Sequence, residues 1–348
     1  MNASISILIY AFFTSLLINI LLISVAKRKN LFIDDINKSH GSHKIPTPRI
    51  GGIGIFISFF FSILFLSFEE SYKLLISALP VFLIGLWEDF KGNINPRIRM
   101  IFMSIGAILS IFTLDVLVEN ISITTLPIFL AVPFTVFALV GITNAVNMID
   151  GYNGLASGIT IISLIFMAYL SYKLGDIELT KLMLVLAVAA LGFLVINFPY
   201  GKIFLGDGGA YTLGFLSGVI SLILLKRHPE VSPWFPVILF AYPVFDVLFA
   251  IFRRKFIQKV SPFSPDKLHF HSLIFKNVTQ NNPLTSVFII FYSLPFSVIS
   301  LNFYNSDLYL SIIFLVFCSS YIFIYFYLFN KEKNSTLKGF NGLMSLKK

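Results

Sequence analysis

The sequence predicts an all-helical protein that crosses a membrane about eleven times, and composition is the first reason. Hydrophobic residues make up 57% of the chain and charged residues 12%, whereas a soluble domain is about 45–50% apolar and about 25% charged. The second reason is that the apolar residues form long runs, and a membrane-spanning helix needs about 20 of them. Eleven runs stand out, and because the third is short the alternative count is ten: 4–26, 51–68, 73–87, 98–118, 126–143, 154–173, 179–197, 208–226, 233–252, 285–303 and 308–329.

The distribution of lysine and arginine predicts the orientation of the chain. If the N-terminus is periplasmic, 21 of the 26 Lys and Arg residues fall in inner loops or after residue 330. Cytoplasmic loops carry such an excess of basic residues. The first run ends in Lys27-Arg28-Lys29 with no small-residue cleavage site, so we interpret it as a span rather than a signal peptide. We expect one multi-pass domain over 1–330 and a basic cytoplasmic tail over 331–348.

Cysteine content and the distribution of charge limit what the protein can contain and bind. The single cysteine, Cys318, lies in an apolar run, so the chain has neither a disulfide framework nor a cysteine-based metal site. The net charge of +9 could suggest nucleic acid, but the basic residues are scattered between hydrophobic segments. This pattern favours membrane lipids and anionic substrates as partners, and no nucleic acid.

The first two inner loops carry charges suited to phosphate chemistry. His43 and Arg49 lie beside two prolines and a glycine pair, and arginine offers a two-pronged donor to a phosphate-bearing lipid headgroup. The alternative is that these basic residues only anchor the loop. In the second loop Glu88 and Asp89 are adjacent and Arg99 follows. Paired carboxylates bind a divalent cation or share a proton, unless they only mark a solvated helix end.

The next two inner loops carry a spaced set of polar residues and a glycine-flanked acid. Asn144, Asn147, Asp150 and Asn153 recur every third residue, which keeps them on one side of a helical turn and predicts a lined cavity. Helix capping explains one such residue but not four. Asp207 lies between glycines at the start of an apolar run. A helix N-terminus attracts phosphate, and an acid beside it predicts a bridging Mg²⁺ unless it is only an Asp-Gly turn.

The longest inner loop follows an acid inside a predicted span. Asp246 lies in the run 233–252, where an ionisable residue marks function or a buried partner. Arg253 is seven residues further along the same helix face, so an ion pair between the two stays open. His269 and His271 end the loop. Without further His or Cys partners a zinc site is not expected, and we interpret the histidines as contacts to a diphosphate.

Together these five blocks, over residues 34–275, resemble the polyprenyl-phosphate sugar-1-phosphate transferases, the MraY- and WecA-like membrane enzymes of glycosyltransferase family 4. The resemblance implies Mg²⁺-dependent transfer of a sugar 1-phosphate from a UDP-sugar to undecaprenyl or another polyprenyl phosphate, with release of UMP; Mn²⁺ is the alternative ion. It implies that Asp207 is a metal ligand, that Asp89 and Asp150 are catalytic with Glu88 as the first acid of the pair, and that Arg99, Asn147, His269 and His271 bind substrate. His43 and Arg49 are expected to bind substrate because of their position and charge in the first inner loop.

Two positions depart from the family pattern. Glu88 stands where many members have aspartate, which leaves the role of the first acid open, and Asn153 also replaces a common aspartate. The pattern leans toward N-acetylhexosamine donors, with UDP-GlcNAc as the default. The resemblance implies a bacterial inner-membrane enzyme that begins a lipid-linked cell-envelope glycan such as O-antigen. It leaves the oligomeric state open, a homodimer included. A multi-span transporter is the alternative, although transporters typically show internal repeats.

Overall fold

The computed structural model describes the chain except for residues 1, 30–46, 67, 262–265, 267 and 346–348. The all-helical prediction is confirmed in this part of the chain, where the only β pairings are the isolated bridges Arg49–Phe204 and Asn120–Thr125. Two short π-helical turns, Arg253–Ile257 and Phe275–Thr279, accompany the helices α1 (Asn2–Lys29), α2 (Gly51–Leu64), α3 (Ser71–Lys91), α4 (Pro96–Leu114), α5 (Ile128–Met148), α6 (Leu155–Lys173), α7 (Ile177–Asn197), α8 (Gly206–Arg227), α9 (Trp234–Leu239), α10 (Ala241–Phe252), α11 (Phe270–Ile274), α12 (Asn282–Ser300) and α13 (Asp307–Ser345).

Fewer helices are long and apolar enough to cross a membrane than the eleven runs suggested. Within the described residues there are eight: α1, α4, α5, α6, α7, α8, α12 and α13. The α2 helix has only 14 residues. The α3 helix contains Pro80 and several charged side chains. The run 233–252 divides at Phe240 into α9 and α10.

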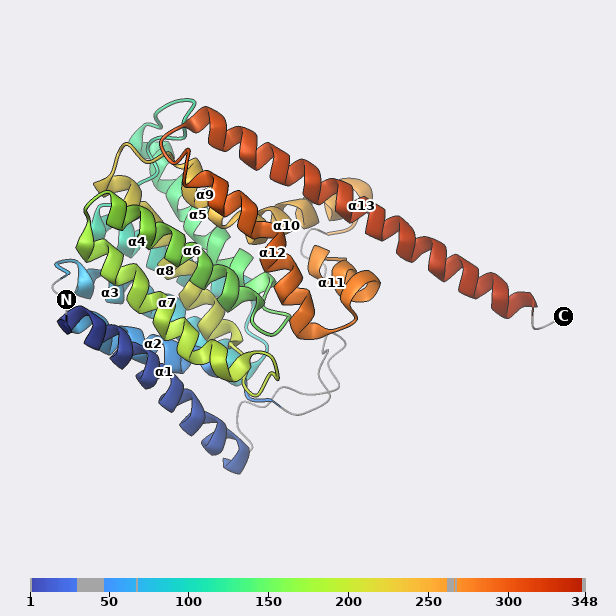
Figure 1. Ribbon diagram of the computed structural model, residues 1–348, viewed down its shortest axis with the longest axis horizontal. Coiled ribbons are helices and arrows are strands. Elements are labelled where there is room, and N and C mark those ends of the chain that lie inside the picture. The colour runs from blue at the N-terminus through green and yellow to red at the C-terminus, as the bar shows by residue number, and fades with distance from the viewer. Residues whose placement is uncertain (1, 30–46, 67, 262–265, 267, 346–348) are drawn as a thin grey trace.

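The α8 helix forms the centre of the bundle. All of its residues from Gly206 to Leu224 are buried, as expected for a helix that is apolar on every face. Small residues allow its neighbours to approach closely: a Cβ on Gly214 would lie 2.9 Å from the Thr143 Cα of α5. The α1 and α13 helices lie at the outside of the bundle (Figure 1) and carry large exposed hydrophobic side chains. The first turn of α8 is therefore surrounded by other helices, and so are the side chains that contact it.

The polar segments gather at one end of this bundle. The segment before α2 pairs with the segment before α8, and the start of α6 is hydrogen-bonded to the start of α12 through Asn153 and Asn282. The end of α7 contacts the start of α6, where Asn197 accepts from the Gly154 N–H at 2.7 Å. The end of α13 extends beyond the bundle (Figure 1), so the last helix continues into the predicted basic tail.

A charged cluster at the opposite end of the bundle connects neighbouring helices. Arg227, at the end of α8, lies 3.0 Å from Glu70 before α3 and 3.2 Å from Asp176 before α7. Its guanidinium also lies over the Phe68 ring, 4.9 Å from the centroid. Only 25% of the Arg227 side chain is exposed. One arginine thus joins the end of α8 to the segments before α3 and α7, whereas the neighbouring Lys226 pairs with the exposed Asp115.

Replacing Arg227 by alanine should lower the stability of the folded protein more than replacing Lys226. The first change leaves the half-buried carboxylates of Glu70 and Asp176 without their partner, which typically costs about 1–3 kcal/mol. An exposed pair such as Lys226–Asp115 contributes less than about 1 kcal/mol. Thermal unfolding in detergent, followed with a thiol-reactive dye on Cys318, measures both. Equal shifts of the unfolding midpoint would contradict this account.

Candidate active site

Asp89 joins the end of α3 to the first turn of α8. Its Oδ1 accepts from the Asp207 N–H at 2.8 Å, and its Oδ2 accepts from the Gly208 N–H at 2.9 Å. These N–H groups have no partner within their own helix, and a carboxylate is favoured at the positive end of the helix dipole. Gly85 permits the contact, because a Cβ there would lie 2.6 Å from the Gly208 Cα. Gly206 adopts φ 75° beside the Asp89 carboxylate, a backbone conformation that favours glycine.

Arg49 reaches the same place through a short parallel pairing of two loops. The Phe204 N–H donates to the Pro48 carbonyl at 2.8 Å, and the Gly51 N–H donates to the Phe204 carbonyl at 2.9 Å. This pairing brings Arg49 Nη2 to 3.2 Å from Asp207 Oδ2 and 4.0 Å from Asp89 Oδ1. The sequence predicted Arg49, Asp89 and Asp207 in three separate loops, and the structure brings them together.

Asp150 lies in the turn between α5 and α6 and interacts electrostatically with this group. Among the described residues its carboxyl accepts no hydrogen bond. Burial raises the pKa of Asp150 well above its usual range; Arg49 opposes this shift, and the nearby Asp207 and Asp89 add to it. The turn is held from both sides, because Asn197 Oδ1 accepts from Gly154 N–H and its Nδ2 donates to the Ile203 carbonyl.

The asparagines of this segment divide into two kinds. Asn144 Nδ2 donates to the Val140 carbonyl at 2.9 Å, and Asn153 Nδ2 donates to the Pro199 carbonyl at 2.9 Å. Both therefore have structural partners. Asn147 is partly exposed at the end of α5, and its carbonyl accepts from the Asp150 N–H at 3.1 Å. The three-residue spacing thus predicted the proximity of Asn147 and Asp150, while Asn144 and Asn153 bond to backbone carbonyls.

The acid cluster, defined as Asp89, Asp150 and Asp207, places three carboxyl groups around the guanidinium of Arg49. In the part of the chain that the structure describes, no three His, Cys, Asp or Glu side chains form a metal site by themselves. Mg²⁺ binds through one or two carboxylates and completes its shell with water and substrate phosphates. Asp207 and the unbonded carboxyl of Asp150 fit this kind of site.

The two members of the acid pair point to different partners. Whereas Asp89 contacts α8, Glu88 Oε2 accepts from the Ile94 N–H at 2.8 Å and so closes the turn between α3 and α4. Its other oxygen lies 3.8 Å from Arg99 Nη1. Arg99 also donates to the Tyr211 hydroxyl at 3.1 Å. The sequence analysis missed Tyr211, although it lies one helical turn after Asp207 and therefore on the same face of α8.

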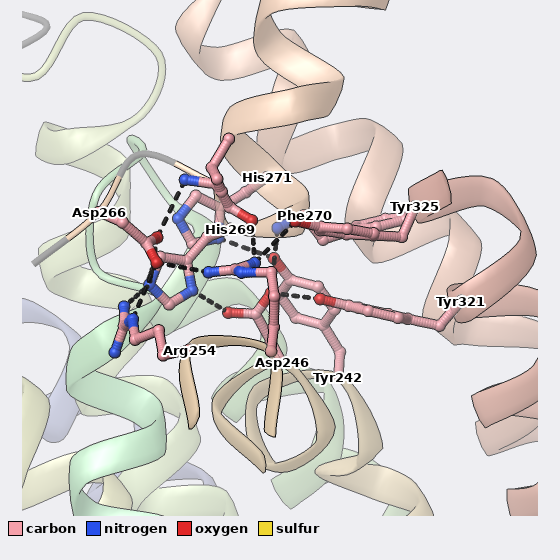
Figure 2. Close-up of polar contacts among 11 residues, drawn as sticks. Tyr242, Asp246, Arg254, Asp266, His269, Phe270, His271, Tyr321 and Tyr325 are labelled. Atoms are coloured by element: carbon pink, nitrogen blue, oxygen red, sulfur yellow. Dashed lines mark hydrogen bonds and ion pairs between the residues drawn. The ribbon is translucent and has the colours of Figure 1, made fainter. Parts of the chain in front are cut away.

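A second polar network surrounds His269 (Figure 2). His269 Nδ1 lies 2.6 Å from Asp246 Oδ2, and the Tyr321 hydroxyl of α13 donates to Asp246 Oδ1 at 2.6 Å. Arg253 instead pairs with Asp266, Nη2 to Oδ2, at 2.6 Å. The sequence left open an ion pair between Asp246 and Arg253. In the structure Asp246 instead contacts His269 and Arg253 pairs with Asp266, and both partners follow α10 in the chain.

The same loop carries a second ion pair and the second histidine. Arg254 Nε donates to Asp266 Oδ2 at 2.8 Å. Burial opposes ionisation of Asp266, but hydrogen bonds from Arg254 and from the Leu268 N–H lower its pKa to about 2. His271 Nδ1 lies 2.9 Å from the Tyr242 hydroxyl, and the His269 and His271 rings stack with centroids 5.3 Å apart. Sequence reasoning identified the histidines but not Tyr242, Arg254 or Asp266. His43 lies outside the described residues.

The sequence of this chain is similar to that of known proteins. The model of the family described as glycosyl transferase family 4 matches residues 71–225, from α3 to α8. The chain is 31% identical over 277 residues to a probable undecaprenyl-phosphate N-acetylglucosaminyl 1-phosphate transferase of Bacillus subtilis, covering 76% of each chain.

Two further relatives carry related names. The chain is 28% identical to the undecaprenyl-phosphate alpha-N-acetylglucosaminyl 1-phosphate transferase of Thermotoga maritima, covering 87% of this chain and 91% of the relative. It is 31% identical to the phospho-N-acetylmuramoyl-pentapeptide-transferase of Staphylococcus carnosus, covering 76% and 88%. The chain therefore belongs to glycosyl transferase family 4 and is a membrane enzyme of the phospho-sugar transferase class.

Proposed function

We propose that this enzyme transfers N-acetylglucosamine 1-phosphate from UDP-GlcNAc to undecaprenyl phosphate or a related polyprenyl phosphate and releases UMP. The observation that carries the proposal is the convergence of Asp89, Asp207 and Arg49 on the first turn of α8. The names of the Bacillus and Thermotoga relatives support this donor and acceptor. On this proposal the product begins a lipid-linked glycan of a bacterial cell envelope.

The proposed membrane arrangement follows from the two substrates. The prenyl tail of the acceptor remains in the bilayer, while its phosphate must meet a soluble nucleotide sugar at the cytoplasmic surface. We therefore assign the end of the bundle that holds the acid cluster to the cytoplasm, with a periplasmic N-terminus and a cytoplasmic C-terminus. In this arrangement α2, α3 and the pair α9–α10 would complete eleven crossings in an inner membrane.

The proposed reaction is one displacement at the β-phosphorus. An acceptor phosphate oxygen forms the new P–O bond while the bond from the β-phosphorus to the bridging oxygen breaks, and UMP carries that oxygen away. A monoester phosphate has a second pKa of about 6, so it is mostly a dianion at pH 7 and needs no strong base. Asp89 is a poor candidate for a covalent intermediate, because both its oxygens are bonded to N–H groups and only 2% of its side chain is exposed.

The roles of individual residues follow from charge and position. Arg49 and Arg99 would contact phosphate oxygens, and 29% and 24% of their side chains are exposed. Asp89 would keep the α8 N–H groups and Asp207 in place, and Asn147 would contact substrate beside Asp150. Asp207 and Asp150 would hold Mg²⁺, with Mn²⁺ as a substitute, and the ion would neutralise charge on the transferred phosphate.

Replacing Asp207 by asparagine should lower UMP release by more than about 100-fold, because electrostatic stabilisation is the main contribution expected in phosphoryl transfer. Purified protein is assayed with polyprenyl phosphate, UDP-GlcNAc and Mg²⁺. Asp115→Asn is the matched control, because Asp115 is 84% exposed and pairs with Lys226 at the opposite end of the bundle. If Asp207→Asn retained full activity, the metal assignment would be wrong.

Removal of divalent ions and a panel of donors test the reaction class. EDTA should abolish UMP release, and Mg²⁺ should restore it, because the acid cluster repels two anionic substrates without a cation. Among UDP-GlcNAc, UDP-GalNAc and UDP-glucose, we expect UDP-GlcNAc to give the highest kcat/KM. Absence of UMP from all three, together with solute uptake by proteoliposomes, would instead support a transporter.

Labelling of introduced cysteines tests the orientation. In a Cys318→Ser background, Glu178→Cys lies at the start of α7 and Lys91→Cys lies at the end of α3, both at exposed positions. A membrane-impermeant maleimide should label Glu178→Cys in spheroplasts and Lys91→Cys only after the membrane is opened. The reverse pattern would place the acid cluster on the periplasmic side.

A further inference from the structure

The two histidines of the α11 region use their ring nitrogens differently. His269 Nδ1–H donates to Asp246, and Nε2 lies 3.2 Å from Arg254 Nη2. A guanidinium only donates, so Nε2 must accept and carries no proton in this arrangement. Burial lowers the pKa of His269, but Asp246 raises it and the net shift is upward; protonating Nε2 would still break its bond with Arg254. Both ring nitrogens of His269 are therefore engaged within the protein.

His271 has one ring nitrogen to offer. Its Nδ1 contacts the Tyr242 hydroxyl, and its Nε2 has no hydrogen-bond partner among the residues that the structure describes. Burial lowers the pKa of His271 to about 4, so the ring is neutral at pH 7 and carries one N–H. Whether that N–H is at Nδ1 or at Nε2 decides whether His271 can donate to a ligand.

The environment of Tyr242 decides this question. Only 1% of Tyr242 is exposed, and its hydroxyl contacts no other acceptor within the described chain. A buried hydroxyl hydrogen without an acceptor is costly, so Tyr242 must donate to His271 Nδ1. The backbone N–H of His271 in turn donates to the Tyr242 oxygen. The proton of the neutral His271 ring is therefore on Nε2.

His271 also lies next to the segment that carries Asp150. The Tyr152 ring, two residues after Asp150, packs edge-on against the His271 ring with centroids 5.3 Å apart. Tyr152 is also hydrogen-bonded to Ser272. His271 thus borders the turn that holds one member of the acid cluster, whereas His269 lies among Asp246, Asp266 and Arg254 (Figure 2).

We propose that Tyr242 is a positioning residue for sugar-phosphate transfer: by donating to His271 Nδ1, it fixes the tautomer whose Nε2–H donates to a diphosphate oxygen of the UDP-sugar. The proposal rests on the function proposed above. His269 then holds the loop in place through Asp246 and Arg254 and makes no direct contact with substrate. Tyr321 assists by donating to the Asp246 carboxylate.

Substitution by the two amides tests which nitrogen of His271 matters. The amide nitrogen of glutamine reaches the position of Nε2, and that of asparagine reaches the position of Nδ1. His271→Gln should keep UMP release within a few-fold of the wild type, whereas His271→Asn should raise the KM for UDP-GlcNAc by about 10- to 100-fold, the usual effect of losing a hydrogen bond to a charged group. Equal activity of the two variants, or higher activity of His271→Asn, would overturn the proposal.

Removal of one hydroxyl tests Tyr242 itself. Tyr242→Phe should raise the KM for UDP-GlcNAc by about tenfold with little change in kcat, because it affects a contact already made in the bound substrate. Tyr292→Phe is the matched control: its hydroxyl bonds to Ser320 and the Phe317 carbonyl, and its ring packs against Phe270. If both variants change KM equally, Tyr242 has only a general structural role.

A measurement without substrate tests the role of Tyr242 separately from the proposed enzymatic function. In protein with ¹⁵N-labelled histidine, NMR distinguishes protonated from unprotonated ring nitrogens, and the His271 signal is assigned with His271→Gln. The wild type should show His271 protonated on Nε2 alone, and Tyr242→Phe should show both tautomers. A wild-type proton on Nδ1 would overturn the inference even if the enzyme is active. Conversely, absence of UMP release from every UDP-sugar would refute the proposed function while the tautomer result stands.

Discussion

The architecture depends on a carboxylate from one helix that binds the first turn of another. Asp89 of α3 accepts both the Asp207 and the Gly208 N–H, and so does for α8 what a capping side chain normally does within a helix. Because α8 is buried from Gly206 to Leu224, a protein group supplies these bonds to its first turn. The interaction requires α3 to approach α8 closely, and the glycines Gly85 and Gly208 at the contact permit this approach.

Charge balance distinguishes the two ends of the bundle. At the end held by Arg227, the arginine lies within 4.0 Å of three acids, one before α3 and two at the start of α7, and the cluster closes connections between helices. At the other end three aspartates share Arg49, and burial raises the pKa of Asp150 well above its usual range. A buried excess of one charge is unfavourable unless an ion of the opposite charge joins it. Protonation of a carboxyl group or a bound cation would each relieve this repulsion, and the function proposed above assigns the second role to Mg²⁺.

Sequence patterns predicted the helical class and the residues of the acid cluster. Apolar runs and the spacing of polar residues can be recognised within one short segment of the chain. They could not predict partners that depend on how distant segments meet. Asp246 and Arg253 share a helix face, yet each finds a closer partner in the loop that returns from α10, as the His269 and Asp266 contacts show. Tyr211 and Tyr242 were overlooked because a tyrosine in an apolar run gives no sign that its hydroxyl is bonded. The break at Phe240 was missed for a similar reason, since both halves of the run are apolar.

The two histidines show why residue type alone does not assign a role. They are two residues apart with stacked rings, and a sequence pattern treats them alike. Their partners differ in what they can exchange: Asp246 accepts and Arg254 donates, which uses both nitrogens of His269, whereas Tyr242 satisfies only Nδ1 of His271. In a buried site each donor must find an acceptor, so the surrounding network sets the position of every ring proton. The difference in role then follows from hydrogen-bond accounting around the two rings.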